Sequence, residues 1–246
     1  QPMRSDNGRY IVAFNGEIYN HLEIRSEIEE LDSKVTWKGH SDTETLLKAI
    51  QVFGWDAALS KLIGMFAIAL WDNTEKQLLI ARDRFGEKPL YYGWQNDTFL
   101  FGSELKAITK HPAFEKIIEK EAVAILLKHG YIATPYSIWK DIYKLPAAHY
   151  LKIDKSSSEP ELVCYWSFKD IVEQAQQNRL EVSNHQTLEE LEMLLTKSIE
   201  RQMISDVPLG AFLSGGVDSS LVVALMQSQT SRPVKTFSIG LHDKQY

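Results

Sequence analysis

The sequence of 246 residues lacks the features that mark secreted or membrane-spanning proteins. Its single cysteine, Cys164, excludes a disulfide framework within the chain and is typical of a reducing compartment, so we expect a cytoplasmic location. The longest apolar run, residues 65–71, is far shorter than the about 20 residues that span a bilayer. We therefore expect no membrane partner.

Positive charge is also scarce. The chain has 27 basic and 33 acidic residues, a formal net charge of −6, and no cluster of lysine and arginine. Nucleic-acid-binding domains usually carry a basic face, so we expect no nucleic-acid partner. The seven histidines form no His or Cys spacing typical of a metal site. At about 150 residues per domain, the length fits one large domain or two modest ones.

The first part of the chain has the pattern of an antiparallel α+β domain. Residues 10–14 (YIVAF) predict a strand that ends at Asn15-Gly16, and a helix is expected to begin at Asp42. The continuous apolar run at 65–71 predicts a strand buried on both faces. Cys164 lies in an apolar stretch, which predicts a small buried side chain.

The last part of the chain has a different pattern. Thr187 and Glu190 match a capping box that would open a helix. Residues 210–213 and 234–239 predict strands on either side of a helix at 219–227. Strand, helix and strand form a βαβ unit, which requires a parallel sheet. The change from antiparallel to parallel structure favours two domains.

A glycine-rich loop, residues 214–220 (SGGVDSS), lies between the first of these strands and the helix. Gly215 and Gly216 permit positive φ and let backbone N–H groups approach an anion, while the helix adds its positive end. Asp218 would repel a phosphate unless a cation such as Mg²⁺ bridges the two. The spacing is not that of a Walker A loop. The alternative is a plain turn with an Asp or Ser helix cap.

With the preceding residues 205–210 (SDVPLG), this loop resembles the PP-loop of asparagine synthetases. The resemblance implies ATP binding and formation of an acyl-adenylate, with Mg²⁺ at Asp218. The ATP-binding residues that it implies are Leu213, Ser214, Gly215, Gly216, Asp218, Ser219 and Ile239.

A second candidate site lies near the start of the chain. The amide of Asn15 and the unhindered N–H of Gly16 could together hold an oxyanion, although a simple turn is the alternative. Asp42, at the expected helix start, could bind an ammonium group or serve as a plain N-cap.

Four segments strengthen this interpretation: residues 15–20 (NGEIYN), 41–44 (SDTE), 64–67 (GMFA) and 82–92 (RDRFGEKPLYY). Their order resembles that in the class II glutamine amidotransferase domains of asparagine synthetases. The resemblance implies an αββα fold of the N-terminal-nucleophile type, followed by the start of an α/β PP-loop domain. It assigns Asn15 and Gly16 to the oxyanion hole, and Asn15, Glu17 and Asp42 to glutamine binding. Residues 103–107 (SELKA) also match, without an assigned role.

The same resemblance predicts the domain boundaries. We expect an amidotransferase domain at 1–168, a polar linker at 169–186 and a PP-loop domain at 187–246. The family's nucleophile is an N-terminal cysteine whose own amine acts as the base. We expect that cysteine to precede Gln1 and most of the synthetase domain to follow Tyr246, which would leave this chain inactive by itself.

The expected function is ATP-dependent synthesis of asparagine from aspartate, with glutamine as nitrogen donor. It would proceed through β-aspartyl-AMP and release AMP, pyrophosphate and glutamate. Three alternatives stay open: a related amidotransferase of a surface-polysaccharide pathway, a β-lactam-synthetase-like enzyme, and a non-catalytic sensor of glutamine or nucleotide. The oligomeric state is also open, with a homodimer among the options.

Overall fold

The computed structural model describes residues 1–154, 160–205 and 207–240. The chain divides into two compact units, Gln1–Gln174 and Ala175–Tyr246, which we describe separately. The division lies within the expected linker, where the structure has a helix, α6 (Phe168–Gln177). The domain boundaries at 168 and 187 stay a prediction.

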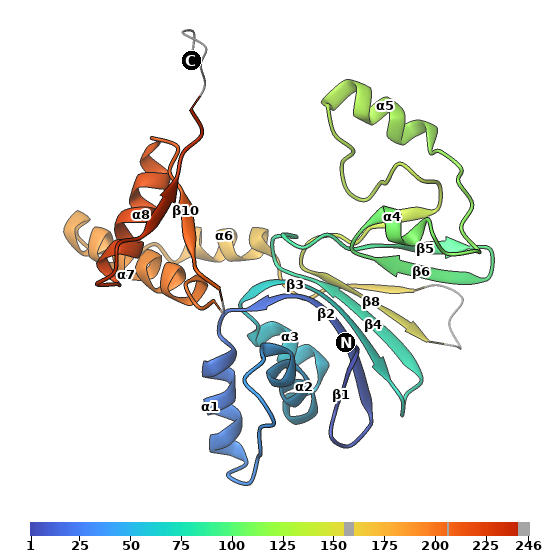
Figure 1. Ribbon diagram of the computed structural model, residues 1–246, viewed down its shortest axis with the longest axis horizontal. Coiled ribbons are helices and arrows are strands. Elements are labelled where there is room, and N and C mark those ends of the chain that lie inside the picture. Colours follow the sequence, from blue (N-terminus) through green and yellow to red (C-terminus); the bar gives the residue numbers. More distant parts are fainter. Residues whose placement is uncertain (155–159, 206, 241–246) are drawn as a thin grey trace. The chain divides into compact units, whose positions relative to one another are not determined.

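The first unit is built on a six-stranded sheet with the order β1-β2-β3-β4-β8-β9, in which every neighbouring pair is antiparallel (Figure 1). Its strands are β1 (Met3–Arg4), β2 (Tyr10–Ile18), β3 (Gly64–Asp72), β4 (Gln77–Arg82), β8 (His149–Asp154) and β9 (Glu161–Cys164). The long central pairing of β2 with β3 extends over the whole of both strands.

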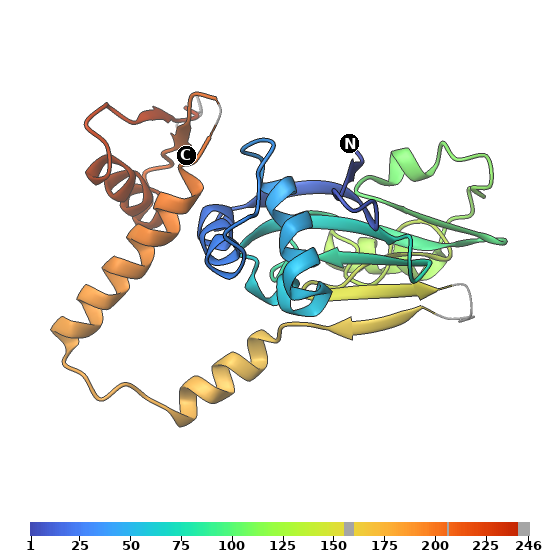
Figure 2. The ribbon, with the colours of Figure 1, turned by 90° about the horizontal axis from the view of Figure 1, so that it is seen from below.

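Three helices cover one face of this sheet, as the view from below shows (Figure 2). They are α1 (His21–Leu31), α2 (Asp42–Phe53) and α3 (Trp55–Lys61). Side chains alternate between the two faces of a strand, so Val12, Phe14 and Ile18 of β2 all point into the core beneath these helices. Helix α2 begins at Asp42 as expected, and Ser41 caps it by accepting the Glu44 N–H at 3.2 Å.

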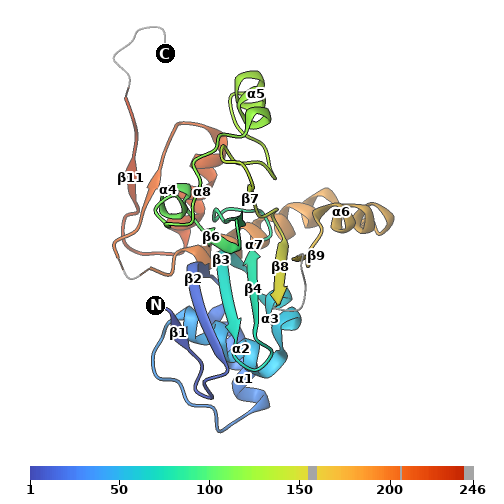
Figure 3. The ribbon, with the colours of Figure 1, turned by 90° about the vertical axis from the view of Figure 1, so that its right-hand side faces the viewer.

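A second, three-stranded sheet lies over the other face, with the order β6-β5-β7 (Figure 3). It comprises β5 (Tyr91–Gln95), β6 (Thr98–Gly102) and β7 (Ile142–Lys144), and the short helix α4 (Leu105–Ile108) and α5 (Lys120–His129) lie beyond it. A buried cluster fills the space between the sheets: Ala67, Ala69, Ile80, Leu90, Leu145 and Leu151. The αββα arrangement with antiparallel sheets is therefore confirmed. Residues 66–70 of β3 are all buried, because helices cover one face and the second sheet the other.

The prediction that the first strand ends at Asn15-Gly16 is wrong. Strand β2 continues through both residues to Ile18, and Gly16 lies directly opposite Phe66 of β3. The Asn-Gly pair is typical of turns, but here the partner strand holds it in the sheet. Tertiary pairing has overridden the local turn preference.

The prediction that Cys164 is buried is also wrong, because its side chain is exposed. Its strand, β9, pairs only with β8 and forms the edge of the sheet. An edge strand has a neighbour on one side only, so an apolar sequence there does not guarantee burial.

The second unit contains the expected βαβ element. This element consists of β10 (Gly210–Phe212), α8 (Val217–Ser228) and β11 (Lys235–Phe237), and β10 and β11 pair in parallel. Helix α7 (Asn184–Gln202) precedes it in the same unit. The N-cap of helix α7 is Ser183, four residues before the predicted cap at Thr187. Its capping box is Ser183 with Gln186, whereas Thr187 donates back to the Ser183 carbonyl. No helix of the described residues is both long enough and apolar enough to cross a bilayer.

We expect Ile68→Ala to lower the free energy of unfolding of this chain by about 2–5 kcal/mol, because Ile68 is fully buried in the central strand β3. Ile68→Val should cost about 0.5–1.5 kcal/mol. Leu127→Ala is the control, since Leu127 is 83% exposed and its truncation should change stability by less than about 0.5 kcal/mol. Chemical denaturation followed by circular dichroism measures all three, and equal losses at Ile68 and Leu127 would contradict the buried core.

Candidate functional site

The end of β2 has one edge that no strand covers. Strand β1 pairs only with Ile11 and Val12, so residues 13–18 of β2 have β3 on one side and no strand on the other. On that open side, the Phe14 N–H and C=O both bind the side-chain amide of Gln1 at 2.7 Å. The Ile18 N–H donates to the Asp42 carboxylate at 2.9 Å.

These contacts determine where the backbone of Gly16 points. In an antiparallel pair, the N–H and C=O groups of alternate residues face opposite edges of the strand. Phe14 and Ile18 face the open edge, whereas the Tyr19 N–H faces β3 and donates to the Ile63 carbonyl at 2.8 Å. The Gly16 N–H therefore points to the open edge, between the groups bound by Gln1 and Asp42.

Gly16 is required by close approach and not by an unusual φ. A Cβ atom at this position would lie 2.1 Å from the Met65 carbonyl oxygen and 2.7 Å from the Phe66 Cα. Such distances are far inside van der Waals contact, so a side chain would push β2 away from β3. The sequence indicates only that the N–H of Gly16 is unhindered, whereas the structure shows that Gly16 is packed tightly against β3.

Asn15 lies on the face of β2 that points away from the helices, and its side chain is exposed. Its Nδ2 donates a hydrogen bond to the Ser103 hydroxyl at 2.9 Å. The amide has a second N–H, and this donor together with the N–H of the neighbouring Gly16 could stabilise a developing oxyanion. The structure thus brings Asn15 and Gly16 together with Ser103, to which the sequence assigns no role. The only signal for Ser103 is its membership in the SELKA segment.

Acidic groups gather at the end of β2. Glu17 is exposed on the same strand face as Asn15. The Asp42 carboxylate accepts the Ile18 N–H, and Ser41 caps α2, so the interpretation of Asp42 as a plain N-cap is wrong. Burial, followed by the nearby Glu87 and Glu17 carboxylates, raises the pKa of Tyr19 to about 12. Negative charge at this place suits a cationic ammonium group.

Cys164 does not belong to this site. Strand β9 lies four strand positions from β2 in the sheet order, which corresponds to roughly 19 Å at about 4.8 Å per strand. A thiol at that distance cannot attack a carbonyl carbon whose oxygen binds Asn15 and Gly16. Cys164 is therefore no nucleophile for this pair of donors.

The RDRFGEKP segment supports the sheet beside the site. Asp83 is fully buried, and its carboxylate accepts four backbone N–H groups: those of Phe66, Phe85, Glu87 and Lys88. The Arg82 guanidinium donates to three backbone carbonyls: those of Gly86, Lys88 and Leu145. Burial lowers the pKa of Arg82. Both side chains hold the loop after β4 against β3, which is a structural role.

In the second unit, the glycine-rich loop joins β10 to the start of α8. Gly215 has φ of +82°, a conformation that favours glycine, and Gly216 is the N-cap residue of α8 with no side-chain cap. The alternative of an Asp or Ser cap is therefore wrong. The N–H groups of the first turn of α8 lack a side-chain cap, and such a turn is suited to bind an anion.

The serines and the strand ends complete this loop. The Ser219 hydroxyl lies 3.0 Å from the Ser214 hydroxyl and 3.2 Å from the Gly216 carbonyl oxygen. The Leu213 N–H donates to Phe237 at 2.9 Å, which places Leu213 beside the end of β11, two residues before the exposed Ile239. The carboxyl ends of the parallel strands β10 and β11 thus lie next to each other. Three of the predicted ATP-binding residues follow these ends: Leu213, Ser214 and Ile239.

Asp218 lies in the exposed first turn of α8. The described residues contain no group of three or more His, Cys, Asp or Glu side chains that could hold a metal ion by themselves. Mg²⁺ at nucleotide sites is usually held by one or two carboxylates together with phosphate oxygens. A single carboxylate beside an anion-binding loop fits that mode.

We expect Gly16→Ala to destabilise the chain by about 1–3 kcal/mol or more, because the new methyl group collides with the backbone of β3. Gly39→Ala is the matched control, since a Cβ there meets only Glu44 Oε2 at 3.7 Å. Its effect should stay within about 0.5 kcal/mol. Denaturation curves of both variants test this, and a Gly16→Ala variant as stable as the parent would disprove the close approach.

Comparison with known proteins agrees with these observations. A family model described as a glutamine amidotransferase domain matches residues 1–166, and one described as asparagine synthase matches residues 190–246. Asparagine synthetase (glutamine-hydrolyzing) 2 of Bacillus subtilis is 34% identical over 227 residues, which are 90% of this chain and 30% of that protein. Asparagine synthetase (glutamine-hydrolyzing) 1 of the same organism is 35% identical over 248 residues, 99% and 37% of the respective chains.

Among solved structures, glutamine phosphoribosylpyrophosphate amidotransferase from B. subtilis is similar with a TM-score of 0.47 and 20% identity, over 68% of this chain and 32% of that one. A relative in Methanocaldococcus jannaschii is 37% identical over 97% of this chain and 44% of its own length. The chain thus spans between 30% and 44% of the length of these three sequence relatives. The chain belongs to the glutamine amidotransferase domain family, whose model covers residues 1–166, and its last part matches the asparagine synthase model.

Proposed function

We propose that this chain carries the glutamine site and the nucleotide loop of an ATP-dependent ligase that makes asparagine from aspartate. The observation that carries the proposal is a pair of donors on neighbouring residues of β2: the Gly16 N–H at the open edge and the Asn15 amide on the exposed strand face. Asn15 and Gly16 are adjacent in β2, the Asn15 amide binds Ser103, and the Asp42 carboxylate accepts the N–H of Ile18 two residues beyond Gly16.

In the glutamine half-reaction, a thiolate attacks the side-chain amide carbon of glutamine and the carbonyl oxygen becomes an oxyanion. The Asn15 Nδ2 and the Gly16 N–H donate to that oxygen. The leaving nitrogen takes up a proton and the C–N bond breaks, which releases ammonia and leaves a thioester. Water then hydrolyses the thioester to glutamate and regenerates the thiol. Asp42 and Glu17 hold the α-ammonium group of glutamine. Because Cys164 lies too far away, the thiolate has to come from a residue other than those of this sequence.

In the synthetase half-reaction, the loop at 214–220 binds the pyrophosphate part of ATP, and Asp218 would hold a Mg²⁺ ion that neutralises phosphate charge. The β-carboxylate of aspartate attacks the α-phosphorus and displaces pyrophosphate, which gives β-aspartyl-AMP. Ammonia then attacks the acyl carbon, and AMP leaves. A free carboxylate resists attack by an amine, whereas the adenylate carries a good leaving group.

The activity is tested with the protein from the complete coding region that contains this sequence. We expect it to form asparagine, glutamate, AMP and pyrophosphate when glutamine, aspartate, ATP and Mg²⁺ are all present, as measured by chromatography. The 246-residue chain by itself should form no asparagine, which provides the control. Glutamine binding without turnover would favour the sensor, and transfer of nitrogen to an acceptor other than aspartate would favour a related amidotransferase.

The roles of two site residues predict separate kinetic effects in that protein. Asn15→Ala should lower kcat of glutamine hydrolysis by about 10²–10³-fold with little change in KM, since the donor acts mainly on the transition state. Asp42→Asn should chiefly raise KM for glutamine, because it weakens binding of the ammonium group. Steady-state assays of glutamate release measure both. An Asn15→Ala variant with unchanged kcat would remove Asn15 from the oxyanion hole.

A further inference from the structure

We propose that Ser103 is a positioning residue of the glutamine site, whose hydroxyl holds the Asn15 amide in the orientation that an oxyanion donor needs. The inference rests on the proposed function and deepens it by adding the residue that directly follows β6 of the second sheet. Ser103 and Asn15 are 88 residues apart in sequence, and their side chains are 2.9 Å apart between Oγ and Nδ2.

Asn15 needs such a partner because its own surroundings leave its side chain free to turn. The residue is exposed, and so are the alternate neighbours on its strand face, Ala13 and Glu17. The terminal torsion of an asparagine is broad and roughly two-fold, so nitrogen and oxygen can exchange places. An amide turned by 180° would present its carbonyl oxygen to an oxyanion and repel it.

The structure has the amide in one of these two orientations, with Nδ2 donating to the Ser103 hydroxyl. When it accepts one N–H from Asn15, the Nδ2 atom is placed and the second N–H is left for a ligand. The Asn15 amide is then fixed in position, as is the Gly16 N–H, which the backbone of β2 holds in place. One donor of the pair is positioned by the strand and the other by a side chain.

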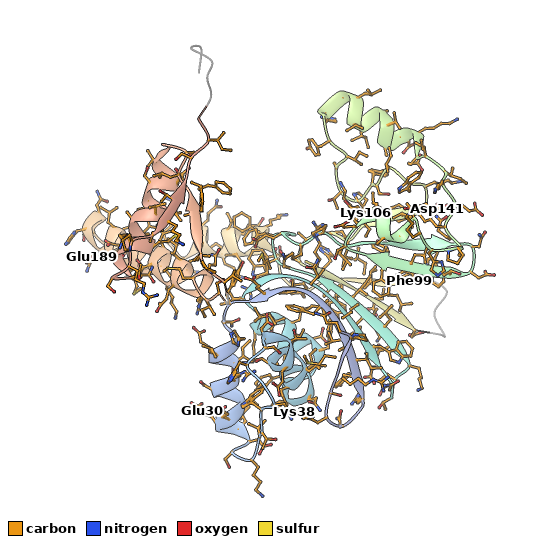
Figure 4. The ribbon with its side chains drawn as sticks, viewed as in Figure 1. Glu30, Lys38, Phe99, Lys106, Asp141 and Glu189 are labelled. Carbon is orange, nitrogen blue, oxygen red and sulfur yellow. The ribbon has the colours of Figure 1, made fainter. Side chains whose placement is uncertain are left out.

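The segment that carries Ser103 is held by strand pairing and by a buried cluster. Ser103 directly follows Gly102, which pairs with Tyr91 in the second sheet, and it precedes α4. Ile108 at the end of α4 is buried in a cluster with Leu100 and Ile142. Figure 4 labels Lys106, which lies on the same short helix and forms an exposed ion pair with Glu104 at 2.8 Å. The buried cluster, and not this surface pair, holds the segment.

A residue that orients a transition-state donor should affect kcat and leave KM nearly unchanged. In the protein from the complete coding region, we expect Ser103→Ala to lower kcat of glutamine hydrolysis about 10- to 100-fold, as a misplaced catalytic group does. Ser103→Thr keeps the hydroxyl and should restore most of the rate. Ser26→Ala is the matched control, because it also removes one side-chain hydrogen bond at an exposed position, to the Leu22 carbonyl at 3.1 Å.

A double-mutant cycle separates positioning from a general loss of structure. If Ser103 acts through Asn15, Ser103→Ala should cause no further loss of kcat in an Asn15→Ala background. Asparagine formation from added ammonia should also be unchanged in Ser103→Ala. An unchanged kcat in the single variant, or an equal loss in both backgrounds, would overturn the proposal. So would a loss of the ammonia-dependent reaction together with the glutamine-dependent one.

A second measurement on the same protein does not depend on turnover. With selective ¹⁵N labelling of asparagine, the Asn15 side-chain NH₂ should be ordered on the picosecond-to-nanosecond scale in the parent protein and in Ser103→Thr, and markedly less ordered in Ser103→Ala. If the parent hydrolyses no glutamine, the proposed function fails, and this comparison still decides the role of Ser103. Equal order in the parent and Ser103→Ala would overturn it.

Discussion

The close contact between Gly16 of β2 and the backbone of β3 is the constraint on which the candidate site depends. Because Gly16 has no side chain, β2 continues past Asn15 without a bulge and stays in register with β3 to Ile18. That continuity preserves the alternation of backbone groups, so the Gly16 N–H and the Ile18 N–H face the same open edge. The Ile18 N–H donates to Asp42, and the Gly16 N–H stays available to a ligand.

The site is assembled from three layers of the first unit. Strand β2 supplies the backbone donor, α2 supplies the Asp42 carboxylate from the helical layer, and Ser103, directly after β6 of the second sheet, supplies a hydroxyl. Strand β2 and helix α2 share one buried cluster, whereas the segment that carries Ser103 packs on another, formed by Leu100, Ile108 and Ile142. Functional groups held by packed elements keep their geometry better than groups on free loops.

The nucleotide loop of the second unit follows a simpler principle. One strand, two glycines and one helix start are enough to place several N–H groups at a single point, so the arrangement is local in sequence. The sequence pattern accordingly predicted this βαβ element and its parallel pairing. The glutamine site is different, since its members are distributed between Asn15 and Ser103 and no local pattern joins them.

The sequence by itself determined the elements whose signals are local: the buried strand β3, the start of α2 at Asp42, the glycine loop, and the residue types at both sites. The tertiary structure alone decided that Asn15-Gly16 lies in a strand and not in a turn, that Cys164 is exposed on an edge strand, and that Ser103 meets Asn15. The physical reason is the same in each case. Hydrophobic periodicity and helix capping depend on residues a few positions apart in the sequence, whereas strand pairing and sheet packing depend on partners many residues away.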